Sequence, residues 1–278
     1  MTEPVGASSI DVKACCAAIY GNELVHLLLG SRLHPGGDEL TRRLAELTDV
    51  GPGDRVLDVA SGLGTTARLL SAERGAAVRG VDLSPRLVML AERAAADAGL
   101  GHLVTFEVGD AERLPVEAAS FDVVLCECSL CTFPDQKAAV AGFMGALAPG
   151  GRVGIADVTV ERDRLPPELD TPIARVACVA GALSASGYEC VLRQGGFTDV
   201  VIEPHPEAAL ATVDAIRDGL DAVRVWLRDG FDVEGALRLV DLARDAVREG
   251  AIGYALITAA VANGPTMESP RGQGRPAG

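Results

Sequence analysis

Short aliphatic runs alternate along the chain with longer segments whose apolar residues recur at helical spacing. These runs predict five successive strand regions: 56–59, 78–82, a strand and its loop over 108–115, 121–126, and a turn leading into a strand over 148–157. The intervening segments predict helices over 38–48, 67–74 and 84–98. Strands that alternate with helices in this way predict a parallel sheet with helices on both faces.

Polar residues at the starts of these helices are the expected caps. Asp38 precedes the first helix, Thr65 or Thr66 the second, and Ser84 the third, where Pro85 takes the first helical position. Such side chains accept hydrogen bonds from backbone N–H groups that have no partner inside the helix.

The second half of the chain departs from simple alternation. Two short helices are predicted over 172–183 and 185–194, and a sixth strand over 199–203. A helical segment over 207–249 then precedes an apolar strand over 253–261, which we expect to pair antiparallel with the fifth strand.

The expected fold class is therefore α/β, with a Rossmann-like, seven-stranded, doubly wound sheet and a helical insert before the last strand. The expected organisation is an N-terminal helical cap (1–49), a main domain (50–206 and 250–262), the helical insert (207–249) and a disordered Gly/Pro-rich tail (263–278).

Charge and composition argue against several classes of partner and location. The formal net charge is −14, from 25 Lys and Arg against 39 Asp and Glu, which argues against nucleic-acid partners and anionic membranes. No apolar run has the length of a membrane span, and residues 1–14 lack a signal-peptide core, so a cytoplasmic location is expected. The seven cysteines are then expected to be thiols.

The turn after the first predicted strand carries the first candidate chemistry. Gly62 and Gly64 permit a tight turn and a close backbone approach to a ligand. Asp82 ends the second predicted strand, where an acid can bind ribose hydroxyls. Asp58 lies just before the turn, which disfavours a pyrophosphate and favours a cofactor with a positive amino group. S-Adenosylmethionine has that amino group, a sulfonium and no phosphate.

The order of these motifs, with Asp110 after the third strand and the Pro-Gly-Gly turn before the fifth, resembles the class I S-adenosylmethionine-dependent methyltransferases over residues 50–160. The resemblance implies a methyltransferase with S-adenosyl-L-methionine as cofactor and with Asp110 facing the adenine amino group. The residues expected to bind the cofactor are Asp58, Ala60, Gly62, Gly64, Asp82, Leu83, Asp110, Ala111 and Glu127. The alternative is a fold of this kind that binds the cofactor without catalysis.

Cysteines gather where the acceptor is expected. Ligands of open α/β sheets bind at the carboxyl edge, and Cys126, Cys128 and Cys131 lie at the end of the fourth strand and just beyond it. Cys126 continues the strand and Cys190 lies in a predicted helix, so both are expected in the core. Cys128 and Cys131 are the candidates for chemistry.

Cys128, the Cys178 segment before Gly-Ala-Leu, and the Gln-Gly-Gly-Phe run over 194–197 together resemble the arsenite methyltransferases. The resemblance implies that Cys128 and Cys178 are catalytic and bind trivalent arsenic as thiolates. Their sulfurs should then lie about 3–4 Å apart, as ligands of one soft centre do. The family usually has a further cysteine before the glycine motif, but residues 29–53 contain none. A third thiolate would therefore come from Cys15, Cys16 or Cys131.

This chemistry is coherent, because soft thiolates suit a thiophilic centre and the arsenic lone pair can attack a sulfonium methyl without a general base. The expected partners are a small-molecule or metalloid substrate and, as further candidates, cellular thiols. Three alternatives stay open: a small-molecule O-, N-, S- or C-methyltransferase with structural cysteines, a non-catalytic sensor, and a zinc site. The first would need a base, with His34, His102 and Asp157 as candidates.

Overall fold

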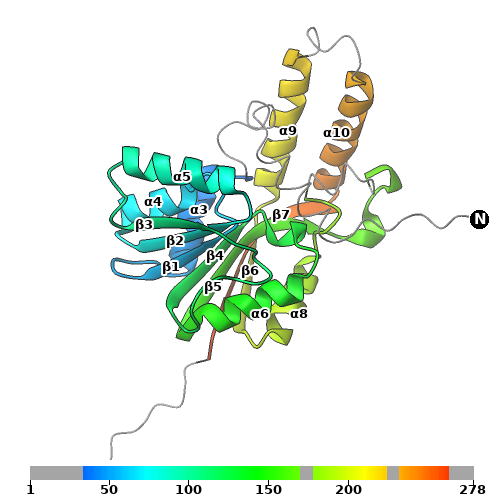
Figure 1. The fold of residues 1–278 in the computed structure, drawn as a ribbon. Coiled ribbons are helices and arrows are strands. Elements are labelled where there is room, and N and C mark those ends of the chain that lie inside the picture. The colour runs from blue at the N-terminus through cyan, green and yellow to red at the C-terminus, as the bar shows by residue number, and fades with distance from the viewer. Residues whose placement is uncertain (1–33, 170–177, 224–231, 263–278) are drawn as a thin grey trace, which may run out of the picture.

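The computed structural model describes residues 34–169, 178–223 and 232–262, which contain one seven-stranded sheet (Figure 1). The strand order across the sheet is β3-β2-β1-β4-β5-β7-β6. The first five strands pair in parallel, whereas β7 is antiparallel to both β5 and β6. The strands are β1 (Arg55–Val59), β2 (Ala77–Asp82), β3 (Val104–Val108), β4 (Phe121–Glu127), β5 (Leu147–Val160), β6 (Thr198–Pro204) and β7 (Ile252–Ala260). The predicted fold class and the antiparallel last strand are thus confirmed.

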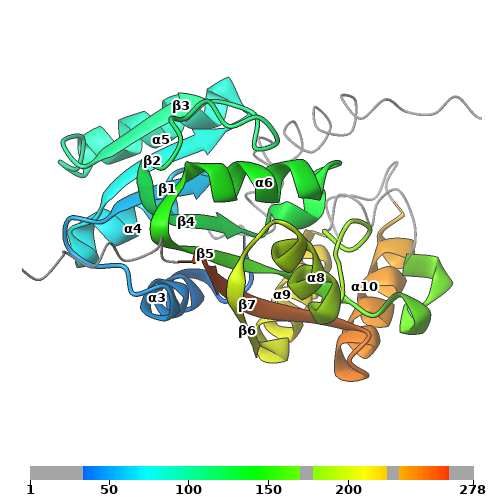
Figure 2. The same cartoon turned by 90° about the horizontal axis from the view of Figure 1, so that it is seen from below.

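Helices cover both faces of the sheet (Figures 1 and 2). One face carries α3 (Gly37–Leu47), α4 (Thr65–Arg74) and α5 (Pro85–Asp97), and the other carries α6 (Gln136–Ala146) and α8 (Ala185–Gln194). The last two helices, α9 (Pro206–Val223) and α10 (Val233–Arg248), pack on each other and project away from the sheet (Figure 1). Short 3-10 turns lie at η1 (Leu130–Thr132), η2 (Arg162–Arg164) and η3 (Pro167–Leu169).

The central strands are buried on both faces, which explains their nearly continuous apolar sequences. In β4, Val123 and Leu125 face the layer under α3, α4 and α5, whereas Val124 and Cys126 face the layer under α6 and α8. Cys126 is fully buried, as predicted. Within the described parts of the chain, no helix combines the length and the apolar character that a bilayer crossing requires.

Two predicted helix caps are wrong. The residue before α3 is Gly36 in the left-handed conformation (φ 77°), and Asp38 lies inside the first turn, where its charge still complements the helix dipole. The residue before α4 is Gly64, and neither Thr65 nor Thr66 caps this helix. The prediction for α5 is confirmed, because the Ser84 side chain accepts a hydrogen bond from the Leu87 N–H group.

Two further predictions fail in the second half. Residues 178–181 form a turn, not the end of a helix, and Leu183 bridges to Thr159 of β5. Residues 172–177 of that predicted helix lie outside the described residues, as do most of the predicted N-terminal cap and the tail. Cys190 is exposed on α8, because the apolar stripe of this helix passes through Tyr188, Val191 and Leu192.

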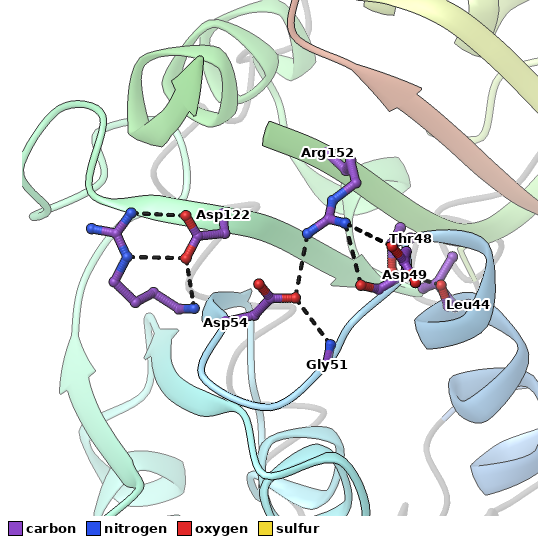
Figure 3. A network of polar contacts seen from close by, with 8 residues as sticks. Leu44, Thr48, Asp49, Gly51, Asp54, Asp122 and Arg152 are labelled. Carbon is purple, nitrogen blue, oxygen red and sulfur yellow. Dashed lines mark hydrogen bonds and ion pairs between the residues drawn. The ribbon is translucent and has the colours of Figure 1, made fainter. Parts of the chain in front are cut away.

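A polar network ties the connection between α3 and β1 to the amino edge of the sheet (Figure 3). The Arg152 guanidinium on β5 donates to the Asp49 carbonyl oxygen at 3.2 Å and to Asp54 Oδ2 at 3.3 Å. Beside it, Arg55 on β1 pairs with the carboxylate of Asp122 on β4 at 2.8 Å. Ligands of open α/β sheets bind at the opposite, carboxyl edge.

Candidate active site

The loop after β1 has the shape of a ligand-binding turn. Ala60, Gly62 and Gly64 all adopt left-handed backbone conformations, with φ of 57°, 54° and 67°. A Cβ on Gly64 would meet the Phe106 ring at 2.3 Å, so this glycine is required by close packing as well as by its conformation.

Asp82 holds this loop in place. Its Oδ2 accepts a hydrogen bond from the Gly62 N–H group at 2.9 Å, and its Oδ1 accepts one from Ser84 at 2.8 Å. Burial raises the pKa of Asp82, and the two backbone hydrogen bonds oppose that rise. Leu83, the next residue, is exposed. The structure therefore brings the predicted acid and the glycine turn together, and the ribose contact stays a prediction.

Asp58 is a buried carboxylate in the middle of the sheet, in register with Gly80 on β2 and Leu125 on β4. Only 3% of the residue is exposed, and among the described residues its Oδ2 has no hydrogen-bond partner. Burial raises its pKa well above the usual range, with smaller contributions from Glu127 and Asp82. A ligand cation is the natural partner for such an oxygen, so Asp58 fits the ammonium group of S-adenosylmethionine.

Glu127, at the end of β4, is held by two hydroxyl groups that the sequence analysis did not assign to the site. Thr41 of α3 donates to Oε1 at 3.0 Å, and Thr66 of α4 donates to Oε2 at 2.5 Å. The His34 Nε2 atom lies 3.8 Å from Oε2. The only sequence signal for Thr66 was its place in the first turn of a helix, which suggested a cap instead.

The end of β3 supplies the remaining predicted cofactor positions. Val108 is in register with Asp82 on β2, so Asp110 and Ala111 follow the neighbouring strand at the same edge. Asp110 Oδ1 accepts a hydrogen bond from the Glu112 N–H group at 3.0 Å, and Ala111 is buried. The adenine contact of Asp110 stays a prediction.

The sulfurs of Cys128 and Cys178 lie 3.8 Å apart across 50 residues of sequence. This distance confirms the predicted approach of about 3–4 Å. Both residues have left-handed backbones, with φ of 50° and 64°, a conformation that is uncommon outside glycine and concentrated at functional sites.

The turn that carries Cys178 is clamped against the loop after β4. Arg162 donates to three carbonyl oxygens of this turn, those of Val179, Ala180 and Ala182. Gln136 donates to the Gly181 carbonyl oxygen at 2.8 Å. A Cβ on Gly181 would lie 1.8 Å from the Cys131 carbonyl oxygen, so only glycine permits this contact.

Cys131 lies in η1 and is buried. Its N–H group donates to Asp157 Oδ2 at 2.8 Å. Burial raises the pKa of the Cys131 thiol well above its usual value, and it raises the pKa of Asp157 to about 7. The hydrogen bond to Cys178 and burial likewise raise the pKa of Cys128. At neutral pH Cys128 and Cys131 are thus neutral thiols.

The zinc alternative finds no support in the part of the chain that the structure describes. There, no group of three or more His, Cys, Asp or Glu side chains is arranged to hold a metal ion. Cys15 and Cys16 lie outside the described residues. Of the candidate bases, His34 lies beside Glu127, whereas His102 lies in the turn that enters β3, at the amino edge. His102 is therefore wrong as a base for chemistry at the carboxyl edge.

Tyr254 on β7 is a residue that sequence reasoning missed. It is 1% exposed, and its hydroxyl has no hydrogen-bond partner among the described residues. Burial raises its pKa, and smaller contributions come from Cys128 and Glu127. Tyr254 pairs with Val158, near the carboxyl end of β5. The sequence did offer a signal: Tyr254 is the one tyrosine in the apolar strand Ile252–Ala260. A buried tyrosine hydroxyl usually has a hydrogen-bond partner, so its position in this strand could have drawn attention to it.

Comparison with known proteins decides the family. Residues 57–155 match the methyltransferase domain family. The O-methyltransferase cnsE of Penicillium expansum is 31% identical over 80% of this chain and 78% of its own length. The chain is a class I S-adenosylmethionine-dependent methyltransferase.

Other relatives of this methyltransferase carry varied names. An arsenite methyltransferase of Halobacterium salinarum is 33% identical over 61% of the chain. The methyltransferase spans about half the length of this relative and of the Streptomyces halstedii methyltransferase GfsG, 44% and 55% respectively.

Solved structures agree on the fold. The [4+2]-cyclase SpnF superimposes with a TM-score of 0.75 and 25% identity, over 94% of this chain and 98% of that one. A Haemonchus contortus phosphoethanolamine N-methyltransferase bound to phosphomonomethylethanolamine and S-adenosylhomocysteine superimposes with a TM-score of 0.76 and 20% identity. The match covers 93% of this chain and 61% of that one. The cofactor of the methyltransferase is S-adenosylmethionine, which supplies an electrophilic methyl group on a sulfonium. The range of activities on this fold means that the substrate must be argued from the site itself.

Proposed function

We propose that this methyltransferase transfers a methyl group to trivalent arsenic held by Cys128 and Cys178. The observation that carries the proposal is the separation of 3.8 Å between their sulfurs. Two ligands that bond one soft centre at about 2.3 Å have their sulfurs about 3–4 Å apart. The two thiols are thus spaced for a shared soft atom before any substrate binds.

The binding step balances without a base. Arsenous acid reacts with the two thiols, so that two As–S bonds form, two As–O bonds break, and each thiol proton leaves with a hydroxide as water. The raised pKa of Cys128 is then no obstacle, because no free thiolate has to form first. Sulfur is preferred over oxygen because the arsenic centre is soft.

The transfer step uses the arsenic lone pair. The lone pair forms a bond to the methyl carbon, the carbon–sulfonium bond breaks, and its electron pair stays on sulfur to give S-adenosylhomocysteine. Arsenic is formally oxidised from the trivalent to the pentavalent state, and no proton moves. The residues proposed to hold the cofactor for this step are those of the glycine turn with Asp58, Asp82, Asp110 and Glu127.

A second candidate is methyl transfer to oxygen of a small organic molecule. It is favoured by the length of the match to the O-methyltransferase cnsE, which exceeds that to the arsenite methyltransferase. A substrate hydroxyl that receives the methyl group must lose its proton to a base. His34 and Asp157 are the candidates near the carboxyl edge. In this case the cysteine pair would be structural.

Transfer of a labelled methyl group from the cofactor to arsenite, in the presence of a reducing thiol, separates the two functions. We expect Cys128→Ser and Cys178→Ser each to abolish the product while calorimetry shows unchanged S-adenosylhomocysteine binding. The matched control is Cys190→Ser, which removes an exposed thiol on α8 and should keep full activity. Retention of arsenite methylation by Cys128→Ser would exclude the dithiol mechanism.

A further inference from the structure

The Tyr254 hydroxyl is one of the buried polar groups that have no hydrogen-bond partner among the described residues. It is buried, and no described residue accepts its proton or donates to its oxygen. A buried hydroxyl without a partner costs about 1–3 kcal/mol, so it is rarely kept without a ligand or a water. The other buried tyrosine, Tyr188, donates to the Val158 carbonyl oxygen at 3.1 Å.

The orphan hydroxyl lies on the same face of the sheet as the cysteine pair. Tyr254 pairs with Val158 across the β5–β7 ladder, and the Cys128 N–H group donates to Ala156, two residues earlier on β5. Tyr254, Cys178 and Cys128 lie in one cluster on the α3 face of the sheet, whereas Tyr188 packs on the opposite face.

The cysteine site leaves one position on arsenic open. Arsenous acid that has exchanged two hydroxyls for Cys128 and Cys178 keeps its third hydroxyl. Among the described residues, no group of three or more His, Cys, Asp or Glu side chains is arranged around one centre, so the pair has no preformed third ligand there. An oxygen left on arsenic in this buried place needs a hydrogen-bond partner.

We propose that Tyr254 binds the substrate by a hydrogen bond from its hydroxyl to the oxygen that remains on arsenic held by Cys128 and Cys178. The inference rests on the proposed function and makes it more specific: the acceptor is a dithiolate with one oxygen ligand, not a trithiolate. Tyr254 also fixes the third arsenic substituent, and with it the direction of the lone pair.

The test compares two trivalent arsenicals on the full-length protein saturated with S-adenosylhomocysteine. Arsenite keeps an oxygen after it binds two thiols, whereas methylarsonous acid loses both hydroxyls as water and keeps only a methyl group. We expect Tyr254→Phe to weaken arsenite binding about tenfold, which is the loss of one hydrogen bond, and to leave methylarsonous acid binding within about twofold.

Thermal unfolding separates this role from a structural one. Tyr254→Phe removes an unpartnered hydroxyl, so its melting temperature should be equal to or above that of the wild type. Tyr188→Phe is the matched control: it removes a satisfied hydroxyl, should lower the melting temperature, and should not discriminate between the two arsenicals.

Several results would overturn the assignment. If Tyr254→Phe weakens the binding of both arsenicals equally, the tyrosine acts through the shape of the pocket and not through a hydrogen bond. If it weakens the binding of neither, Tyr254 does not contact the substrate. Selective loss of arsenite binding in Cys16→Ser or Cys131→Ser would make the third ligand a sulfur. If the wild type binds neither arsenical, the proposed function itself is wrong, and so is this inference. That outcome is distinguishable from the others because it is seen before any variant is measured.

Discussion

The Thr66 hydroxyl at the start of α4 donates to Glu127 Oε2 at the end of β4, with 2.5 Å between the two oxygens. The bond joins the glycine-turn helix to the strand that ends in the cysteine loop. The acidic oxygens of Glu127 and Asp58 are near enough that Glu127 contributes to the raised pKa of Asp58. This edge of the sheet thus gathers buried carboxyl groups that fit a cationic cofactor.

A first prediction concerns Thr66→Val. Loss of the hydroxyl should leave Glu127 held by Thr41 alone and weaken S-adenosylhomocysteine binding by about 1 kcal/mol, because one of the hydrogen bonds that orient the carboxyl group is lost. Methylthioadenosine lacks the amino acid portion and should bind Thr66→Val as it binds the wild type. Calorimetry with both ligands measures this, with Thr65→Val as the control. Equal weakening for both ligands would instead indicate damage to the whole glycine turn.

A second prediction concerns Asp82. Asp82→Ala should lower cofactor affinity by about 1–3 kcal/mol, through the lost ribose contact and the loosened Gly62 N–H group. Asp82→Asn keeps an oxygen acceptor for the loop and should lose less. Calorimetric titration with S-adenosylhomocysteine gives both values. Unchanged affinity in Asp82→Ala would remove Asp82 from the ribose role.

A third prediction concerns Gly181. Its Cβ in Gly181→Ala would collide with the Cys131 backbone, so the turn must shift and move Cys178 away from Cys128. We expect strongly reduced arsenite binding and a lower melting temperature, with S-adenosylhomocysteine binding preserved.

The matched control for this variant is Gly145→Ala in α6, where a new Cβ meets nothing within 4 Å. It should leave arsenite binding unchanged and raise stability by up to about 1 kcal/mol, because alanine favours a helix over glycine. Wild-type arsenite affinity in Gly181→Ala would show that the thiol pair does not depend on this turn.

A fourth prediction concerns pH and the link between α3 and β6. The Arg43 guanidinium, together with His205, lowers the pKa of Glu203 to about 2. A pKa depressed in the folded state stabilises the fold above the unfolded pKa, and this contribution is lost as the pH falls through about 2.

Arg43→Met should therefore lower the melting temperature near pH 6, and its difference from the wild type should shrink as the pH falls from about 4.5 toward 2. Arg193→Met, which removes an exposed pair with Glu189 on α8, is the control and should show little effect at any pH. If the difference in melting temperature between Arg43→Met and the wild type did not change with pH, Arg43 would stabilise the fold through its packing and not through its charge.

The sequence by itself determined the sheet and the cofactor edge. Strand identity follows from local apolar runs, and the parallel order follows from the alternation with helices, so Asp58, Gly62 and Asp82 could be assigned to one edge. The Cys128–Cys178 approach was also predicted, from the resemblance to arsenite methyltransferases, although nothing local encodes it.

Tertiary structure decided the rest, because those features depend on atoms brought together from distant segments. Thr66 has the local pattern of a helix cap, and only the tertiary fold, which brings the start of α4 to the end of β4, makes it a donor to Glu127. Cys190 lies in α8, and the sheet packs against the face of this helix that carries Tyr188, Val191 and Leu192. Cys190 is therefore exposed. The unpartnered state of Tyr254 exists only once β7 is inserted between β5 and β6, since burial and missing partners are properties of surroundings that no single segment specifies.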